Sequence, residues 1–393
     1  MPVWHLYIKT QKFLVINNKN ICFSITEFSY TERMVIMAKF SKIGVLTSGG
    51  DAQGMNACLK AITHKAQEEG IEVLGVVGGY SGLIHDQFVD MNTKSVANIV
   101  GLGGTFLYSD RCLEFQTEEG MNRAVEVCKK HNIDAIIAIG GDGTFRGATD
   151  LTAHGIPTIG IPGTIDNDIT ATDYTIGFDT SMNVTLDMID CLRDTCESHK
   201  RCNVVEVMGR NCGQIALETA IASGALAAVI PEVPFDEEAA LAKIKQCRED
   251  GKRGMIVVVS EGVIAPDGRK FGEYFAEKIE EETGIETKFA RFAHVVRGGK
   301  PTVRDRVTAA QMASAAVDKL LEGKSNLVIC EFDGEIVSFD INFALITDRM
   351  YKNKLKDGDL DKFNDEQIAE MKKICEKRRK EINDLYHITN MYY

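Results

Sequence analysis

The chain has 393 residues, of which 44% are hydrophobic and 26% are charged, and its formal net charge at pH 7 is -12. This composition excludes a largely disordered protein, and the length allows two α/β lobes. The acidic balance argues against a general nucleic-acid-binding surface, so basic residues have to be considered one by one as candidate ligands of phosphorylated molecules.

Residues 1–40 differ from the rest because aromatic residues alternate with lysines and glycine is absent. Polar residues interrupt every apolar run, so we expect a cytoplasmic protein without a signal peptide or a membrane partner. Because Met34 and Met37 precede the first periodic segment, we interpret residues 1–40 as an N-terminal extension, either disordered or a mis-assigned start. A partner-binding arm is a second interpretation. The 11 cysteines include no Cys-x-x-Cys pair, which favours reduced thiols.

From Lys42 onward, strand-like and helix-like segments alternate as is typical of a parallel α/β sheet. In chain order, the predicted elements are strand 43–46, helix 55–69, strand 73–77, helix 123–130, strand 135–139, strand 158–161, helix 180–192, strand 203–207 and strand 255–259. We therefore predict an α/β fold of two interlocked, Rossmann-like lobes whose largely parallel sheets are flanked by helices. The expected boundaries are a catalytic region at 41–351, one lobe at about 41–178 plus part of the C-terminal region, the other at about 179–340, and a charged, exposed helix or tail at 352–393.

Three of the predicted strands end in loops that combine glycine with aspartate. The loops lie at 47–56, at 140–144 (GGDGT) and at 162–168 (PGTIDND). Because the carboxyl ends of parallel strands meet at one edge of a sheet, we expect these loops to converge. Glycine lets the backbone approach phosphate closely, Asp142 is a candidate magnesium ligand, and Asp166 is a candidate base for an attacking hydroxyl. The loops together predict a phosphoryl-transfer centre.

More motifs accompany these loops, at 103–107 with Ser109 and Arg111, at 174–178, at 193–195 with His199 and Arg201, at 204–210 and at 294–299. In this order the motifs resemble those of the bacterial-type ATP-dependent 6-phosphofructokinases, over residues 42 to about 339. The resemblance implies a phosphofructokinase-like fold in which ATP and sugar phosphate meet between the lobes. It also implies glycolytic transfer of the γ-phosphoryl group of ATP to the 1-hydroxyl of fructose 6-phosphate, with Mg2+ and without a covalent intermediate.

The resemblance also implies a role for individual residues. Asp166 would be the base, Thr164 would position the transferring group, Arg111 and Arg210 would stabilise it, and Asp142 would hold the metal. The implied ATP-binding residues are Gly50, Arg111, Cys112, Gly141, Asp142, Gly143 and Thr144. The implied substrate-binding residues are Thr164, Ile165, Asp166, Arg201, Met208, Gly209, Arg210, Glu261, Lys288, His294, Val295, Val296 and Arg297. Arg201 and Lys288 would reach the site from a neighbouring subunit of a homotetramer or dimer.

Two glycines bear on the phosphoryl donor. Pyrophosphate-using relatives place an aspartate and a lysine at the positions of Gly143 and Gly163, where side chains would occupy the space of the nucleotide's α-phosphate. The glycines at both positions therefore favour ATP as the donor.

The sequence departs from the family pattern at Lys288, where an arginine is usual, and at Val296, where a glutamine is usual. Lysine keeps the charge but lacks the two aligned donors of a guanidinium, so a different acceptor sugar phosphate, tagatose 6-phosphate or sedoheptulose 7-phosphate, stays open as a hypothesis. The effector site has also lost several phosphate-binding charges, so we expect weak or absent classical regulation.

Two more hypotheses concern the class of protein. The GGDGT motif also occurs in NAD kinases and lipid kinases, but the segments 164–168 and 208–210 argue against that class. A catalytically silent regulatory subunit that binds nucleotide or sugar phosphate is the second hypothesis. It is disfavoured because the chain keeps the residues expected to carry the chemistry, Asp142, Asp166, Arg111 and Arg210.

Overall fold

The computed structural model describes residues 13–17, 20–24 and 40–391. The chain separates into two compact units, Met1–Lys39 and Phe40–Tyr393. In the first unit, β1 (Phe13–Asn17) and β2 (Asn20–Ser24) pair as an antiparallel hairpin. The rest of the predicted N-terminal extension lies outside the described residues. Among the described helices, none is both long enough and apolar enough to cross a membrane.

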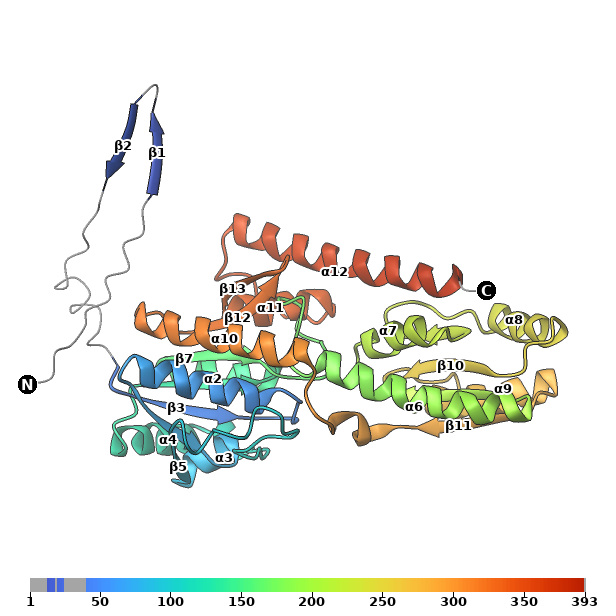
Figure 1. Ribbon diagram of the computed structural model, residues 1–393, viewed down its shortest axis with the longest axis horizontal. Coiled ribbons are helices and arrows are strands. Elements are labelled where there is room, and N and C mark those ends of the chain that lie inside the picture. The colour runs from blue at the N-terminus through green and yellow to red at the C-terminus, as the bar shows by residue number, and fades with distance from the viewer. Residues whose placement is uncertain (1–12, 18–19, 25–39, 392–393) are drawn as a thin grey trace, which may run out of the picture. The chain divides into compact units, whose positions relative to one another are not determined.

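The larger unit contains a seven-stranded sheet in the order β13-β12-β7-β6-β3-β4-β5 (Figure 1). Its central pairs are parallel, whereas β4–β5 and β12–β13 are antiparallel. The strands are β3 (Lys42–Thr47), β4 (Glu72–Val76), β5 (Phe88–Met91), β6 (Ala135–Gly140), β7 (Thr158–Pro162), β12 (Leu327–Phe332) and β13 (Glu335–Asp340).

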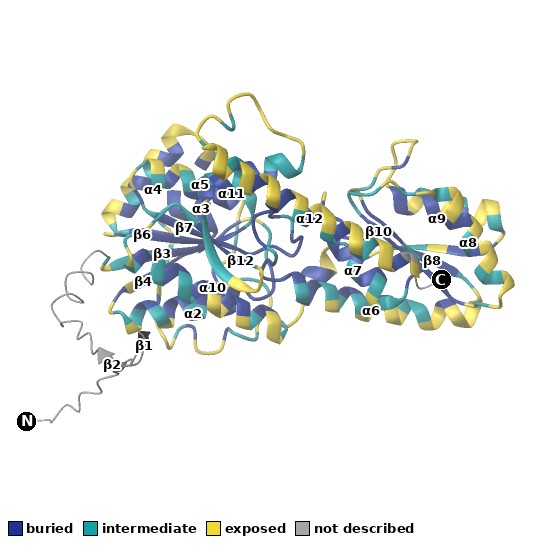
Figure 2. Ribbon diagram, turned by 90° about the horizontal axis from the view of Figure 1, so that it is seen from above, coloured by how far each residue is buried: buried dark blue, intermediate teal, exposed yellow. Residues whose placement is uncertain are grey.

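Helices cover both faces of this sheet, as the buried strands of Figure 2 show. Every residue of β6 is buried, and its side chains alternate between two apolar clusters. Ile137 and Ile139 pack with the residues of α2 and α10, whereas Ile136 and Ala138 pack with those of α3 and α4. The covering elements are α2 (Met55–Glu68), α3 (Gly79–Ile84), the short helix η1 (Glu114–Gln116), α4 (Glu118–Lys130), α5 (Asp142–Ala153), α10 (Val303–Leu321) and α11 (Ile341–Tyr351).

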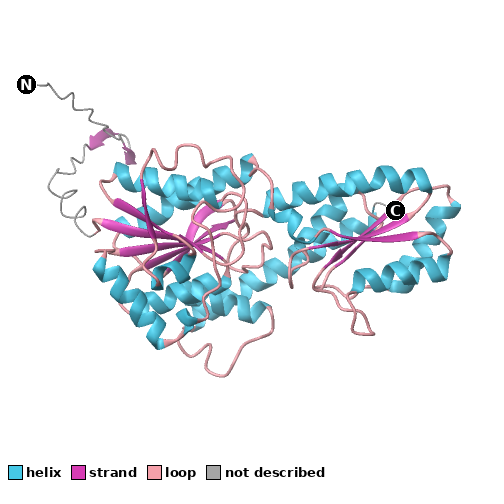
Figure 3. Cartoon of the chain, turned by 90° about the horizontal axis from the view of Figure 1, so that it is seen from below, coloured by secondary structure: helices cyan, strands magenta, loops and turns pink. Residues whose placement is uncertain are grey.

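A second, four-stranded sheet has the order β11-β8-β10-β9 and is parallel throughout (Figure 3). Alternate residues of β10 again face two clusters, because Val258 packs with α7 and Val257 packs with α8 and α9. The elements of this lobe are α6 (Phe178–His199), β8 (Cys202–Val207), α7 (Gln214–Ser223), β9 (Ala227–Val229), α8 (Glu237–Glu249), β10 (Met255–Ser260), α9 (Phe271–Thr283), β11 (Thr287–Arg291) and the short helix η2 (Ala293–Arg297). The predicted α/β class with two largely parallel sheets is confirmed.

The chain returns to the first sheet earlier than the predicted boundary of about residue 340. The last strand of the second sheet ends at Arg291, and α10 already packs against α2 of the first lobe. β12 then pairs with β7, with Leu327 opposite Ile159. The segment 303–340 therefore belongs to the first lobe, because an open edge of β7 and the apolar face of α2 both need a cover.

The C-terminal segment contains a helix, which is one of the two forms that the charge run suggested, but this helix is not exposed on all sides. Residues Asp365–Met391 form the long helix α12, which packs against α11 of the first lobe and α7 of the second (Figure 1). One face of the helix is buried at Met371, Ile374 and Ile382. The spacing of these residues, three and eight positions apart, gives an apolar stripe among the charges.

Candidate active site

The loops that follow β3, β6 and β7 open onto one cavity of about 510 Å³ at the carboxyl edge of the first sheet. This is where ligands enter parallel α/β sheets, because the loops there leave backbone groups without sheet partners. The whole of the predicted ATP-binding set lines the cavity, namely Gly50, Arg111, Cys112, Gly141, Asp142, Gly143 and Thr144. Thr164, Arg210 and Arg297 of the predicted substrate set line it as well.

The start of α5 shapes the floor of the cavity. Gly141 precedes the first helical residue, and the hydroxyl of Thr144 donates a hydrogen bond to the carbonyl oxygen of Ser48 at 3.1 Å. A Cβ built on Gly143 would meet no atom within 4 Å, whereas one on Gly140 would lie 2.3 Å from Thr144 Oγ1. The free backbone at this helix N-terminus is suited to an anion such as phosphate.

Gly143 and Gly163 have different surroundings, although both were expected to leave room for a nucleotide phosphate. A Cβ on Gly163 would lie 3.0 Å from Ile139 and 3.1 Å from Met55, both in the apolar core. Gly163 is therefore tightly packed behind the loop, and a Cβ there would require these neighbours to shift by a few tenths of an ångström. Of these two glycines, only Gly143 faces open space in the cavity. The structure therefore supports the preference for ATP as phosphoryl donor at Gly143 and not at Gly163.

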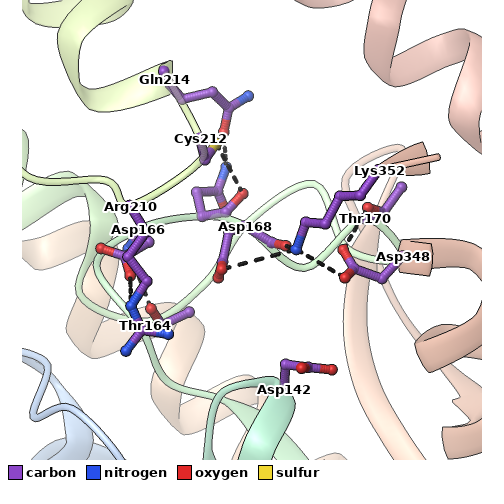
Figure 4. Close-up of polar contacts among 12 residues, drawn as sticks. Asp142, Thr164, Asp166, Asp168, Thr170, Arg210, Cys212, Gln214, Asp348 and Lys352 are labelled. Atoms are coloured by element: carbon purple, nitrogen blue, oxygen red, sulfur yellow. Dashed lines mark hydrogen bonds and ion pairs between the residues drawn. The ribbon is translucent and has the colours of Figure 1, made fainter. Parts of the chain in front are cut away.

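Asp166 is the most deeply buried charged group beside the cavity, with 1% of its surface exposed. Its Oδ2 lies 3.3 Å from Arg210 Nε (Figure 4). Its Oδ1 lies 4.0 Å from Arg297 Nη2. Burial and the neighbouring charge of Asp168 raise the pKa of Asp166 to about 6, against the opposing effect of the two arginines. Among the described residues, Oδ1 has no hydrogen-bond partner. This carboxylate can therefore accept a proton near neutral pH.

The local backbone fixes the direction of Asp166 and Arg210. The amide of Asp166 donates to Thr164 Oγ1 at 3.2 Å. Gly209 has φ 138° and Arg210 has φ 52°, so the chain turns sharply after β8, and the amide of Arg210 donates to Glu261 Oε1 at 3.0 Å. Glu261, which follows the end of the neighbouring strand β10, thus positions the loop that contains Arg210.

Two carboxylates face the floor of the cavity. Asp142 lies at the start of α5, where its Oδ2 is 2.6 Å from Arg146 Nη2. Asp168 is the last residue of the 162–168 loop, which we call the catalytic loop after its predicted role. Burial raises the pKa of Asp168, and the ammonium of Lys352, 4.0 Å from Asp168 Oδ2, opposes that rise. Within the described part of the chain, no group of three His, Cys, Asp or Glu side chains forms a complete metal cage. One or two carboxylates fit magnesium, which completes its coordination with phosphate oxygens and water.

Some members of the predicted substrate set place only backbone near the site. The side chains of Ile165 and Val296 are fully buried in the core, so a contact of these residues with a ligand would have to be made by their backbone. The carbonyl of Val296 accepts a hydrogen bond from Gln53 Nε2 at 2.9 Å, which ties η2 to the first glycine loop. Of the remaining members, Met208 is buried and Val295 is 60% exposed; His294 precedes Val295 in η2.

Arg201 and Lys288 lie together but away from the cavity. Both pair with Glu286, Arg201 Nε at 2.8 Å and Lys288 Nζ at 3.1 Å. Arg201 precedes the first residue of β8, whereas Arg210 follows its end, and a strand of six residues spans roughly 20 Å. Within one protomer these two cations therefore cannot reach the group that contacts Arg210.

Sequence analysis missed two cations near the catalytic loop. Lys352 Nζ is 2.8 Å from Asp348 Oδ2 and donates to the carbonyl of Asp168 at 3.1 Å (Figure 4). Arg378 of α12 donates to the carbonyl of Asn167 at 2.6 Å. The four-residue spacing of Asp348 and Lys352 was the only sequence signal for either of them.

The fold and the cavity define an α/β enzyme of the phosphoryl-transfer class. The family model of phosphofructokinase matches residues 42–320, more than half of the 393 residues. The chain belongs to the phosphofructokinase family, as the motifs predicted.

The similar proteins include ATP-dependent 6-phosphofructokinase 1 of Clostridium perfringens, which is 48% identical over 314 residues that cover 80% of this chain and 97% of that protein. ATP-dependent 6-phosphofructokinase of Clostridium botulinum is 47% identical over 315 residues, with the same coverage. A solved structure of phosphofructokinase from Saccharomyces cerevisiae superposes with a TM-score of 0.75 at 30% identity, and covers 82% of this chain. This chain spans about half of the yeast chain, 48% of its length.

Proposed function

We propose that this protein is an ATP-dependent 6-phosphofructokinase that transfers the γ-phosphoryl group of ATP to the 1-hydroxyl of fructose 6-phosphate. The observation that carries the proposal is Asp166, a buried carboxylate with a pKa raised to about 6, next to the cavity that the glycine loops form. One of its oxygens accepts no hydrogen bond from any described residue. The names of the clostridial relatives support the same donor and reaction.

In the proposed reaction, the 1-hydroxyl oxygen of the sugar attacks the γ-phosphorus while its proton passes to the Asp166 carboxylate. The bond from the γ-phosphorus to the bridging oxygen breaks, and that oxygen leaves with ADP. Arg210 and Arg297 stabilise the transferring group and hold the base in place. The amides at the start of α5 bind the phosphates of ATP, and open space at Gly143 admits them.

Asp142 and Asp168 would hold magnesium at the cavity floor together with phosphate oxygens. When bound, the ion neutralises the negative charge of the phosphates. Asp168 keeps its orientation through Lys352, whose ammonium also donates a hydrogen bond to the Asp168 carbonyl.

We place the protein in the cytoplasm, because the ten cysteines with described side chains are all free thiols, as a reducing compartment maintains them.

The sugar side of the site is proposed to be completed by a second copy of the chain. Arg201 and Lys288 form one basic surface with Glu286, a strand length from Arg210. A homodimer or homotetramer that brings this surface to the cavity of a neighbour would supply two charges for the 6-phosphate.

The proposal is tested by steady-state phosphorylation with the purified full chain and magnesium. ATP is compared with pyrophosphate as donor, and fructose 6-phosphate with tagatose 6-phosphate and sedoheptulose 7-phosphate as acceptor. We expect preference for ATP and fructose 6-phosphate, with little ATP hydrolysis when the sugar is absent. Preference for another acceptor would assign specificity to Lys288, and no turnover with any pair would reject the proposed activity.

A further inference from the structure

Three consecutive cations of α12 reach three different parts of the larger unit. Lys377 Nζ pairs with Asp173 at 2.9 Å and with Asp333 at 2.8 Å. Arg379 Nη2 donates to the carbonyl of Tyr351 at 3.1 Å. The triplet, which looked in the sequence like part of a solvated charge run, thus anchors the helix at several points.

Arg378, at the centre of the triplet, is directed inward and is 6% exposed. Its Nη2 donates to the carbonyl of Asn167 at 2.6 Å and to Gln214 Oε1 at 2.8 Å. The amide of the Asn167 side chain also donates to Gln214 Oε1, at 2.7 Å. The three residues form a buried set of hydrogen bonds that holds the catalytic loop at the carbonyl and at the side-chain amide of Asn167.

Asn167 follows Asp166 in the chain and has φ 47°, a left-handed conformation that is uncommon for a residue other than glycine. Asparagine enters this region more readily than most residues, and the surrounding contacts select it here over the right-handed and extended conformations. Arg378 holds the carbonyl of the peptide that joins Asn167 to Asp168. With that peptide fixed and Asn167 in this conformation, the backbone of the loop is held on the side that carries Asp166 as well as on the side that carries Asp168. The contact therefore acts on Asp166, although Arg378 does not contact its carboxylate.

The position of α12 gives this contact a wider effect. The helix packs against α11 of the first lobe and against α7 and β9 of the second, and Gln214 is the first residue of α7. Arg378 thus joins the catalytic loop of one lobe to the first helical turn of the other. A rearrangement of the lobes would have to move the loop, α7 and α12 together, or break these bonds.

We propose that Arg378 is a positioning residue that sets the direction of the Asp166 carboxylate through the Asn167 peptide. Loss of the guanidinium leaves the carbonyl of Asn167 and the amide oxygen of Gln214 buried with fewer donors, and the left-handed turn loses a support. Displacement of a catalytic group by about 1 Å can cost a hundredfold in rate. The inference rests on the proposed function for its kinetic effect, but the effect on the loop itself does not depend on it.

The test compares the variants R378M and R378K with R379M in the full chain. R379M is the matched control, because it removes the same charge from the neighbouring position of α12, where the contact is with Tyr351. We expect R378M to lower kcat about tenfold or more, to change the KM for ATP by less than about twofold, and to shift the acid limb of the pH profile. R378K keeps one charged donor and is expected to regain part of kcat, and R379M to match the wild type.

Hydrogen exchange of the 164–168 backbone, measured in the absence of substrates, is the readout that needs no activity. We expect faster exchange in R378M and not in R379M. If R378M does not fold, R378K carries the comparison with wild type, and slower turnover with faster loop exchange is expected for it. A folded R378M with wild-type kcat, acid limb and loop exchange would overturn the inference. Failure of the wild type itself to phosphorylate fructose 6-phosphate would instead reject the proposed function, and the exchange data would still decide the role of Arg378.

Discussion

The two sides of the proposed site differ in how much of them one chain provides. On the nucleotide side, every predicted residue lines one cavity, and Gly143 faces open space there. On the sugar side, Arg201 and Lys288 pair with Glu286 away from that cavity. Loops at one edge of a sheet can form a phosphate site within a single chain. A site that needs residues of two protomers is incomplete when one chain is considered alone. Asp166 lies where the two sides meet.

The largest effect is expected from Asp166→Asn, which removes the proposed base. We expect kcat to fall by about a hundredfold or more, because positioned proton transfer contributes that much. In the wild type, kcat should decline as the pH falls through about 6, since protonation of Asp166 then removes the acceptor. This acid limb should be absent from the residual activity of the variant. Measured kcat near that of the wild type would remove Asp166 from the mechanism.

The melting temperature of Asp166→Asn shows whether its loss of turnover comes from the missing base or from a damaged fold. The folded-state pKa of Asp166 is raised, so holding the ionised carboxylate destabilises the fold at pH values above the ordinary value near 3.8. The amide introduced by Asp166→Asn has no charge to desolvate, and the variant should unfold at the same or a higher temperature at pH values above about 7. A large fall in the melting temperature would mean that the lost turnover reports on unfolding.

A smaller effect is expected from Gly143→Asp, which tests the nucleotide side alone. The new carboxylate would enter open space at the start of α5 and repel the phosphates of ATP. We expect the KM for ATP to rise by about tenfold or more, with a much smaller change in the KM for fructose 6-phosphate. Gly143→Ala is the control, because a methyl group fits there without charge. Equal changes in both KM values would contradict the separation of the two sides.

The nucleotide side was predictable because its chemistry lies in short segments. Apolar runs such as 135–139 indicated buried strands, and the glycines and aspartates that follow them are contiguous. The order of the strands then required the loops to meet. Short segments of sequence were therefore enough to predict the fold class and to select Asp142 and Asp166 as candidate site residues.

What could not be predicted depends on contacts between distant segments or on the direction of a side chain. Lys352 and Arg378 reach the catalytic loop from 184 and 211 positions away, within stretches whose charges resembled a solvated surface. Val296 and Gly163 occur in motif positions, yet packing turns Val296 into the core and leaves little room beside Gly163. Tertiary packing decides such directions, and no single motif encodes it.

On the sugar side, Arg201→Ala is expected to raise the KM for fructose 6-phosphate by about tenfold while the KM for ATP stays nearly constant, since a charge-assisted hydrogen bond to phosphate is lost. A mixture of two variants tests more sharply which chain's site Arg201 serves. If Arg201 serves the site of a neighbour, hybrids of Arg201→Ala with Asp166→Asn contain some sites that have both wild-type residues. Such hybrids should be more active at low sugar concentration than either parent. A mixture no more active than its parents would contradict a role for Arg201 in the site of a neighbouring chain.

The smallest effect is expected from Lys288→Arg, which probes how the sugar phosphate is held. A guanidinium offers two parallel donors to a phosphate, whereas an ammonium offers a single charge with no fixed plane. Lys288 is 55% exposed and pairs with Glu286, so an arginine has room to adopt the same direction. We expect the KM for fructose 6-phosphate to fall by about twofold to fivefold without a change in kcat, because the 6-phosphate does not react. A gain for fructose 6-phosphate together with a loss for a longer sugar phosphate would identify position 288 as a determinant of acceptor choice. An unchanged KM for every acceptor would leave Arg201 as the main phosphate ligand of the second protomer.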